Sequence, residues 1–177
     1  MKATGIVRRI DELGRIVVPK EIRRTFRIKE GTPLEIFIGD SGELILKKYS
    51  PILELSDLAE EVAESIFSTL NCIVLITDLE RVIAVNGASK RNFENKDISF
   101  HIEKVLHERQ SVIKNGVEII KVCDCQELDT QSQLISSIIC NGDVIGGVIL
   151  LSKTQNFTQN DIKIVKTMIN FIEKQIS

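Results

Sequence analysis

The stretch "IDELGRIVVPKEIRRTF" (residues 10–26) reads as a turn, a short strand and the start of a helix. "DELG" (11–14) is polar and ends in glycine, which favours a tight turn. The β-branched run "RIVVP" (15–19) is typical of a strand, and Pro19 ends it. Proline is favoured at the first helical position, because the N–H that it lacks has no intrahelical partner there. The sequence therefore predicts that Pro19 opens a helix.

The predicted helix carries its charge on one side. Ile22 and Phe26 stand four residues apart and share an apolar face. The other side carries a stripe of bases at positions i, i+3, i+4 and i+7, namely Lys20, Arg23, Arg24 and Arg27. Like charges at this spacing destabilise a helix, so the stripe indicates an anionic partner.

Further strands are predicted on both sides of this stretch. "TGIVRRI" (4–10) precedes it, and "LEIFIG" (34–39) and "ELILKK" (43–48) follow it, joined by a glycine-rich hairpin connection. The resulting β–β–α–β–β unit has more apolar side chains than about 50 residues can cover alone. Pairing with a second copy would cover them, so we expect a dimer.

The charge of the chain is divided unevenly. Residues 1–50 hold 11 Lys and Arg against 7 Asp and Glu, a net charge of +4. Residues 51–177 hold 12 against 18, a net charge of −6. A basic N-terminal part on an acidic remainder favours nucleic acid as the partner of the basic part.

The acidic part predicts an α+β sandwich. Residues 56–70 have the apolar spacing of an amphipathic helix, with Ser56 as its N-cap. The stripe allows this helix to pack on its own sheet, on another subunit, or on both if the stripe is broad enough. The β-rich runs that follow are residues 72–78, 81–87, 116–124, 132–140 and 144–153.

Two local patterns are specific within this part. Thr158 and Asp161 form a capping-box pattern for the last helix, with Phe157 placed to contact Ile162 as a hydrophobic staple. Paired glycines at residues 146–147 indicate a bulge or a close approach of another backbone.

The first 50 residues resemble the swapped-hairpin DNA-binding domain of the AbrB-type transition-state regulators. The resemblance rests on "TGIVRRIDELGRIVVPKEIRRTFRIKEGTPLEIFI" with "GELILKKY" behind it. It implies a dimeric fold in which two chains interleave their hairpins and basic side chains contact double-stranded DNA. The matching positions are Arg8, Arg9, Arg15, Lys20, Arg23 and Arg24. Arginine suits this role because its planar fork donates two hydrogen bonds to a phosphate or to guanine.

Residues 56–177 resemble a GAF domain, a fold that senses small molecules, through the strand order and "NGDVIGGVILLSK" before a capped helix. A chain that combines these two parts resembles the sporulation regulators that activate and repress transcription. This resemblance implies a homotetramer, with a signal-sensing or oligomerising part that can take a small-molecule ligand. The implied domains are residues 1–50, a linker and helix at 51–70, and the GAF-like part at 71–177.

Other classes of function have weaker support. No Ser/His/Asp set, phosphate-binding loop or metal motif is present, so we expect no enzyme, cofactor or metal. "VCDCQ" leaves a thiol-based redox enzyme of the GAF fold as an alternative through Cys123 and Cys125, although Asp124 would raise their pKa values. An antitoxin is the other alternative, because AbrB-like domains also occur on antitoxins.

The location is predicted from what the chain lacks. No apolar run approaches the ~20 residues of a membrane span. The first residues have no apolar signal-peptide core. We therefore expect a cytoplasmic, nucleoid-associated protein without a membrane partner.

Overall fold

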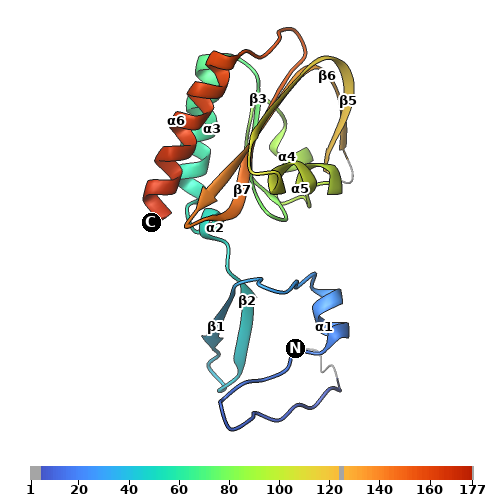
Figure 1. Cartoon of the computed structure of the whole chain (residues 1–177), viewed down its shortest axis with the longest axis vertical. Coiled ribbons are helices and arrows are strands. Elements are labelled where there is room, and N and C mark those ends of the chain that lie inside the picture. The colour runs from blue at the N-terminus through green and yellow to red at the C-terminus, as the bar shows by residue number, and fades with distance from the viewer. Residues whose placement is uncertain (1–4, 124–125, 177) are drawn as a thin grey trace. The chain divides into compact units, whose positions relative to one another are not determined.

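A computed structural model describes residues 5–123 and 126–176. The chain divides into two compact units, Met1–Tyr49 and Ser50–Ser177, here named the head and the body (Figure 1). The head contains a two-stranded sheet and the body a five-stranded sheet.

The head has one short helix and one hairpin. Helix α1 (Lys20–Thr25) begins after Pro19, which is its N-cap rather than its first helical residue. Arg27 then adopts a left-handed φ of +52°, and the N–H of Ile28 donates to the carbonyl oxygen of Arg23 at 2.7 Å. This closure ends the helix one turn earlier than its sequence spacing predicts.

The hairpin of the head is regular. Strands β1 (Leu34–Ile38) and β2 (Leu44–Lys48) pair antiparallel, with Ile36 opposite Leu46 and Ile38 opposite Leu44. Directly opposed residues of an antiparallel pair lie on the same face. One face of this hairpin is therefore lined by aliphatic side chains.

The two strands predicted before the helix are absent from the single chain. Residues 5–10 and 15–19 have no strand assignment. Only the turn between them is closed, by the N–H of Asp11 donating to the oxygen of Arg15 at 3.1 Å and that of Gly14 to the oxygen of Asp11 at 3.0 Å. A strand is defined by a continuous ladder with its partner, and no such ladder is assigned to these segments among the described residues.

The described residues of the head also form no apolar core. Among its described residues only Pro19 is buried. Eight apolar side chains are at least 60% exposed: Val7, Ile10, Leu13, Val17, Phe26, Ile36, Ile38 and Leu44. Burial of apolar side chains is the main favourable term in folding, at about 25 cal/mol per Å². The single head therefore leaves its largest source of stability unused.

The body is an antiparallel sheet between two helical layers. Its strand order is β4-β3-β7-β6-β5, and α3 and α6 lie side by side on one face while α4 and α5 cover the other (Figure 1). The helices are α2 (Pro51–Glu54), α3 (Ser56–Leu70), α4 (Lys90–Phe93), α5 (Phe100–His107) and α6 (Gln159–Ile176). The strands are β3 (Ile73–Asp78), β4 (Val82–Asn86), β5 (Ser111–Cys123), β6 (Gln126–Cys140) and β7 (Asp143–Ser152).

Each face of this sheet has its own apolar cluster. Val62 and Ile66 of α3 are buried against the sheet together with Val165 and Ile169 of α6. The helix at 56–70 thus packs on its own sheet, one of the two arrangements that its apolar stripe allows. Its N-cap is Leu55 rather than the predicted Ser56.

The start of the last helix follows the predicted pattern. The N–H of Thr158 donates to Oδ2 of Asp161 at 2.7 Å, and Phe157 is buried in the cluster on which Ile162 packs. Asn115 of β5 fixes the preceding loop, because its Nδ2 donates to the oxygen of Phe157 at 3.0 Å.

Strand β5 is longer than predicted. It begins at Ser111, five residues before the predicted start at Gly116. Gly116 has a φ of +130°, and the pairing with β6 shifts register between Asn115 and Glu118. The glycine is therefore a bulge inside a strand, not the beginning of one.

Close approach explains the glycine pair in β7. A Cβ at Gly146 would overlap the carbonyl oxygen of Thr77, and one at Gly147 would overlap the side chain of Leu106. Glycine at these positions lets β3 and α5 approach β7 from two sides.

We expect Gly146→Ala to lower the free energy of unfolding by about 3 kcal/mol, because the overlapping atom is backbone and moves only with its strand. Chemical denaturation followed by circular dichroism measures this change. Asp143→Ala, at an exposed position of the same strand, is the control and should stay within about 0.5 kcal/mol of wild type. Equal stability of Gly146→Ala and wild type would contradict the close approach.

Candidate nucleic-acid interface

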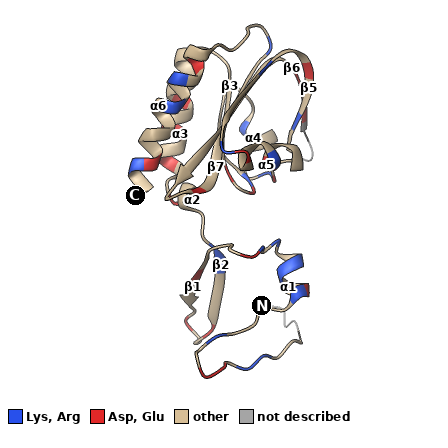
Figure 2. Cartoon of the chain, viewed as in Figure 1, with Lys and Arg blue, Asp and Glu red and all other residues tan. Residues whose placement is uncertain are grey.

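All six bases predicted to contact DNA lie on the surface of the head. Lys20, Arg23 and Arg24 belong to α1, whereas Arg8 and Arg9 lie in the segment before the turn at residues 11–14. Arg15 directly follows that turn, and each of the six side chains is exposed. Figure 2 shows the lysines and arginines of α1 and of the irregular N-terminal segment.

The basic stripe on α1 is shorter than predicted. The helix has six residues, so Lys20, Arg23 and Arg24 remain on one side. Arg27 falls outside the helix with its left-handed backbone and leaves the stripe. Within the described chain, the three remaining bases have no carboxylate at ion-pair distance. Three adjacent charges without a counter-ion from the protein suit an external anion.

Arg15 differs from the other bases because it is held by a carboxylate. Its Nε lies 2.8 Å from Oδ2 of Asp11. The other oxygen of Asp11, Oδ1, accepts the N–H of Arg15 at 2.8 Å and that of Leu13 at 3.0 Å. The backbone and side-chain hydrogen bonds from Arg15 hold the pKa of Asp11 below its ordinary value of 3.8. Asp11 is therefore ionised at neutral pH.

Sequence reasoning identified Asp11 only as part of a turn. Aspartate with a glycine three residues later is typical of a turn in which the side chain bonds to the backbone. This pattern is the sequence signal that could have identified the hydrogen bonds of Asp11. Lys47 is a further base that sequence reasoning missed. Its ammonium lies 4.6 Å from the ring centre of Phe37, a distance typical of a cation–π contact.

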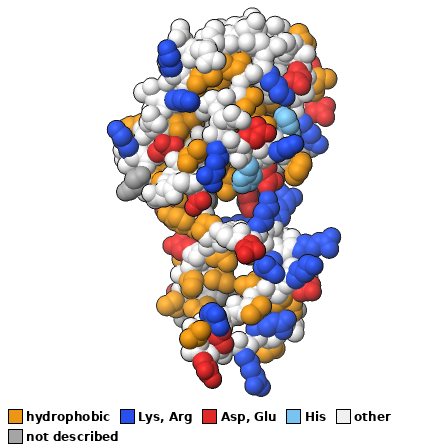
Figure 3. Space-filling view, viewed as in Figure 1, with side chains coloured by type: hydrophobic (Ala, Val, Ile, Leu, Met, Phe, Trp, Pro, Cys, Tyr) orange, Lys and Arg blue, Asp and Glu red, His pale blue; other side chains and the backbone are white. Residues whose placement is uncertain are grey.

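Basic and apolar groups lie close together on the head. Figure 3 shows lysine and arginine side chains and hydrophobic side chains exposed on the same face of this unit. The alternation is visible in the sequence, where Arg8 and Arg9 stand between the exposed side chains of Val7 and Ile10. A surface of this composition can bind an anion and pack on a second apolar surface.

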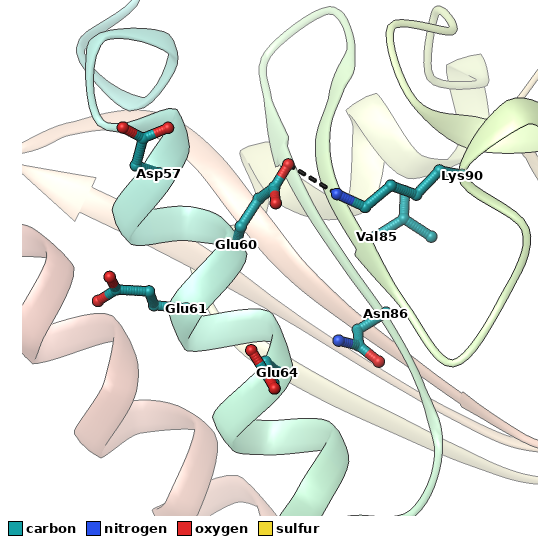
Figure 4. Close-up of a pocket in the computed structure, with 7 residues that line it drawn as sticks. All are labelled: Asp57, Glu60, Glu61, Glu64, Val85, Asn86 and Lys90. Carbon is teal, nitrogen blue, oxygen red and sulfur yellow. Dashed lines mark ion pairs between the residues drawn. The ribbon is translucent and has the colours of Figure 1, made fainter.

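The body has an acidic groove instead of a basic surface. A groove of about 470 Å³ lies between α3, β4 and α4 (Figure 4). Its lining residues are Asp57, Glu60, Glu61, Glu64, Val85, Asn86 and Lys90. Lys90 Nζ lies 2.8 Å from Oε1 of Glu60, and this hydrogen bond raises the pKa of Lys90. Four carboxylates against one paired base make the groove unsuitable for a phosphate or another anion.

The three described thiols of the body lie in its interior. Cys72, Cys123 and Cys140 are buried. Burial, with a smaller contribution from the charge of Asp161, raises the pKa of Cys72 to about 12. A thiol with so high a pKa is a poor nucleophile at neutral pH. Cys125, the second thiol of the predicted pair, lies outside the described residues.

The described residues contain neither a metal-binding cluster nor a membrane-spanning helix. Among residues 5–123 and 126–176, no three His, Cys, Asp or Glu side chains gather in a way that could hold a metal ion. The helices of these residues are too short or too polar to cross a membrane.

Two protein families match the chain. Residues 54–177 match the family described as stage V sporulation protein T C-terminal, transcription factor. Residues 7–54 match the family described as antidote-toxin recognition MazE, bacterial antitoxin. The first match covers the body, and the second covers the region of the predicted DNA-contacting bases.

Two relatives from Bacillus subtilis extend this result. Stage V sporulation protein T is 47% identical over 176 residues, which is 99% of both chains. Transition state regulatory protein AbrB is 45% identical over 87 residues, which is 40% of this chain and 90% of AbrB. The resemblance of the first 50 residues to the AbrB-type regulators is therefore confirmed.

Solved structures show the fold of the body. The GAF domain of a phosphotransferase from Acinetobacter has 13% identity, covers 73% of this chain and 84% of its own, and gives a TM-score of 0.58. A type II free methionine-R-sulfoxide reductase from Thermoplasma acidophilum has 15% identity, covers 71% and 94%, and gives a TM-score of 0.57. At such identities the likeness concerns the fold alone, and the GAF-like fold is confirmed.

The full-length relative settles the class of function. Its alignment runs through both units, and the family of the body is described as a transcription factor. Shared fold with a reductase does not carry that enzyme's chemistry to this chain. The chain belongs to the stage V sporulation protein T family and is a DNA-binding transcription regulator of sporulation, not an enzyme.

Proposed function

We propose that this regulator activates some sporulation genes and represses others by binding double-stranded DNA through the head. The observation that carries the proposal is that the basic side chains of the head are exposed, in a chain that is 47% identical to stage V sporulation protein T. The contacting residues would be Arg8, Arg9, Arg15, Lys20, Arg23 and Arg24. The protein would act in the cytoplasm as part of the nucleoid.

Most of these contacts would be to phosphates. Helix α1 has six residues, fewer than a helix needs to follow the major groove over several base pairs. Arginine and lysine side chains without protein counter-ions suit the evenly spaced charges of the DNA backbone. Phosphate contacts position a protein on the duplex and contribute most of its salt-dependent affinity.

The heads of two chains would form one dimeric fold. The described residues of the head form no core, and segments 5–10 and 15–19 have no strand assignment. Interleaving with a second head would supply both a core and strand pairing, because strands from one chain would pair with strands from the other. The aliphatic face of the β1–β2 hairpin would then be covered, and two sets of bases would be joined in one surface.

The body would join two such dimers into a tetramer and couple them to a signal. Residues 71–177, with the helix at 56–70 packed on them, would be the sensory or oligomerising domain, and residues 1–50 the DNA-binding domain. The GAF-like fold supports this division, and a small molecule is the class of ligand to test. A change in the body would alter the spacing of the two DNA-binding dimers and so the sites that they span.

Two other functions have specific but weaker support. The antitoxin family matches only residues 7–54, whereas the body has two buried apolar clusters of its own. A redox function would need an accessible thiolate, and the buried Cys72 and Cys123 do not provide one. Neither alternative accounts for the similarity along the full chain.

Arg23→Ala and Arg24→Ala should each lower DNA affinity about fivefold or more, because each removes a charged contact. In a dimer each substitution removes two contacts, so the slope of log K against log salt should fall by about two units. Fluorescence anisotropy at several salt concentrations measures both values. Lys166→Ala on α6 is the control, since Lys166 is an exposed base of the body. Unchanged salt slopes would remove these two arginines from the interface.

Leu46→Asp should break the head contact, because it places a charge on the aliphatic face of the hairpin. Native mass spectrometry of the full chain should show tetramers for wild type and dimers, joined through the bodies, for the variant. Gln110→Asp, the same added charge at an exposed site of the body, should leave the tetramer intact. A tetrameric Leu46→Asp would refute the head contact, and a dimeric wild type would refute the tetramer.

If the body couples the two DNA-binding dimers, the full chain should bind paired DNA sites differently from the head alone. DNA fragments with two sites at varied spacing should be bound cooperatively by the full chain and without spacing preference by residues 1–55. Gel-shift titration measures the two binding curves. If the short chain bound every natural site with the affinity and cooperativity of the full chain, coupling through the body would be unnecessary.

A further inference from the structure

Asp11 accepts three hydrogen bonds from residues of the turn that it begins and from Arg15, which follows that turn. Its Oδ1 accepts N–H groups of Leu13 and Arg15 at 3.0 and 2.8 Å, and its Oδ2 accepts Nε–H of Arg15 at 2.8 Å. Gly14, with a φ of +75°, reverses the chain direction and so brings Arg15 back to Asp11. One carboxylate thus fixes both the backbone and the side chain of Arg15.

The position of Asp11 is unfavourable for a surface that binds DNA. A carboxylate beside a phosphate-binding arginine repels the phosphates and so weakens the attraction between that arginine and the DNA. The ion pair also adds little stability, because the side chains of Asp11 and Arg15 are 42% and 70% exposed. The two backbone hydrogen bonds to Oδ1 stabilise the turn, but neither they nor attraction to DNA explains why Oδ2 also holds the side chain of Arg15.

Geometry offers the explanation. A guanidinium is planar and has five N–H groups in fixed directions. When Nε–H is bound to a carboxylate, the edge formed by the two Nη groups points away from that carboxylate and remains available. This edge is a fork that can donate two parallel hydrogen bonds to guanine O6 and N7 or to a phosphate.

We propose that Asp11 is a positioning residue that aims the Nη edge of Arg15 at the DNA. The inference rests on the proposed DNA contact of Arg15 and deepens it. An unrestrained arginine side chain loses rotamer entropy when it is fixed. Asp11 imposes part of this restriction before DNA arrives, so the bound contact is better defined.

The other predicted bases lack this arrangement. Within the described chain, Arg23 and Arg24 have no carboxylate partner, and Nη1 of Arg8 donates to the carbonyl oxygen of Val7 at 3.0 Å. A mobile lysine or arginine side chain can follow a phosphate. Two hydrogen bonds to the edge of a nucleobase require a guanidinium that is held in one direction. Arg15 is therefore the residue of this surface that reads sequence.

Asp11→Asn tests the positioning, because it keeps an oxygen acceptor for the backbone and removes the charge that holds Nε. The probes are a duplex selected by the wild-type full chain from a random pool and a random-sequence duplex, both measured by anisotropy. Affinity for the selected duplex should fall about fivefold, the value expected for losing one charge-assisted contact. Affinity for the random duplex should stay constant or rise, because a negative charge has been removed.

Glu12→Gln is the matched control. Glu12 is the adjacent exposed carboxylate of the same turn, and its substitution removes the same charge without touching Arg15. It should tighten binding to both duplexes slightly. If Asp11→Asn also tightened binding to the selected duplex, charge alone would explain Asp11 and the inference would be overturned.

A double-mutant cycle separates positioning from turn stability. In an Arg15→Ala chain, Asp11→Asn should no longer weaken binding to the selected duplex. An equal loss in both backgrounds would show a structural role of the turn and overturn the inference. If Arg15→Ala itself left the selectivity unchanged, Arg15 would not read sequence and the inference would fail, while Arg23→Ala and Arg24→Ala test the DNA-binding function separately.

Discussion

Burial of apolar surface is the constraint that separates the two parts of this chain. The body covers both faces of its sheet with helices, and the side chains of Ile66 and Leu150 are fully buried there. The head has a single hairpin and a six-residue helix, and Ile38 is 81% exposed. A unit of this size cannot close a core from its own residues. In the proposed dimer, a second head would supply the partner surface that completes this fold.

This dependence places the DNA contacts under the control of assembly. The bases that carry the proposed interface lie either on α1 or on segments that have no strand assignment within the described chain. In the proposed dimer, the same contacts that cover the apolar side chains would order these segments. The acidic body, whose groove repels anions, would leave the duplex to the heads. Assembly and DNA binding would then be linked free energies.

Local sequence patterns correctly predicted the features that depend on interactions between neighbouring residues. Proline before α1, the Thr158–Asp161 cap and the β1–β2 hairpin depend on neighbours within a few residues, and the structure has all three. Features that depend on distant atoms were missed or misread. Gly116 resembled a strand start but is a bulge set by pairing with β6. The early end of α1 is local, because the left-handed backbone of Arg27 sets it, but sequence spacing did not reveal it.

The sequence by itself determined which residues carry charge, where the two parts divide their net charge, and which runs are apolar at helical or strand spacing. These properties are local, so one chain read in order contains them. Tertiary structure decided that α3 packs on its own sheet and that Gly146 meets β3. The closed turn decided that Asp11 holds Arg15 and not a base of α1. Each of these depends on the direction in which a side chain points after the chain has turned, and spacing alone does not determine that direction.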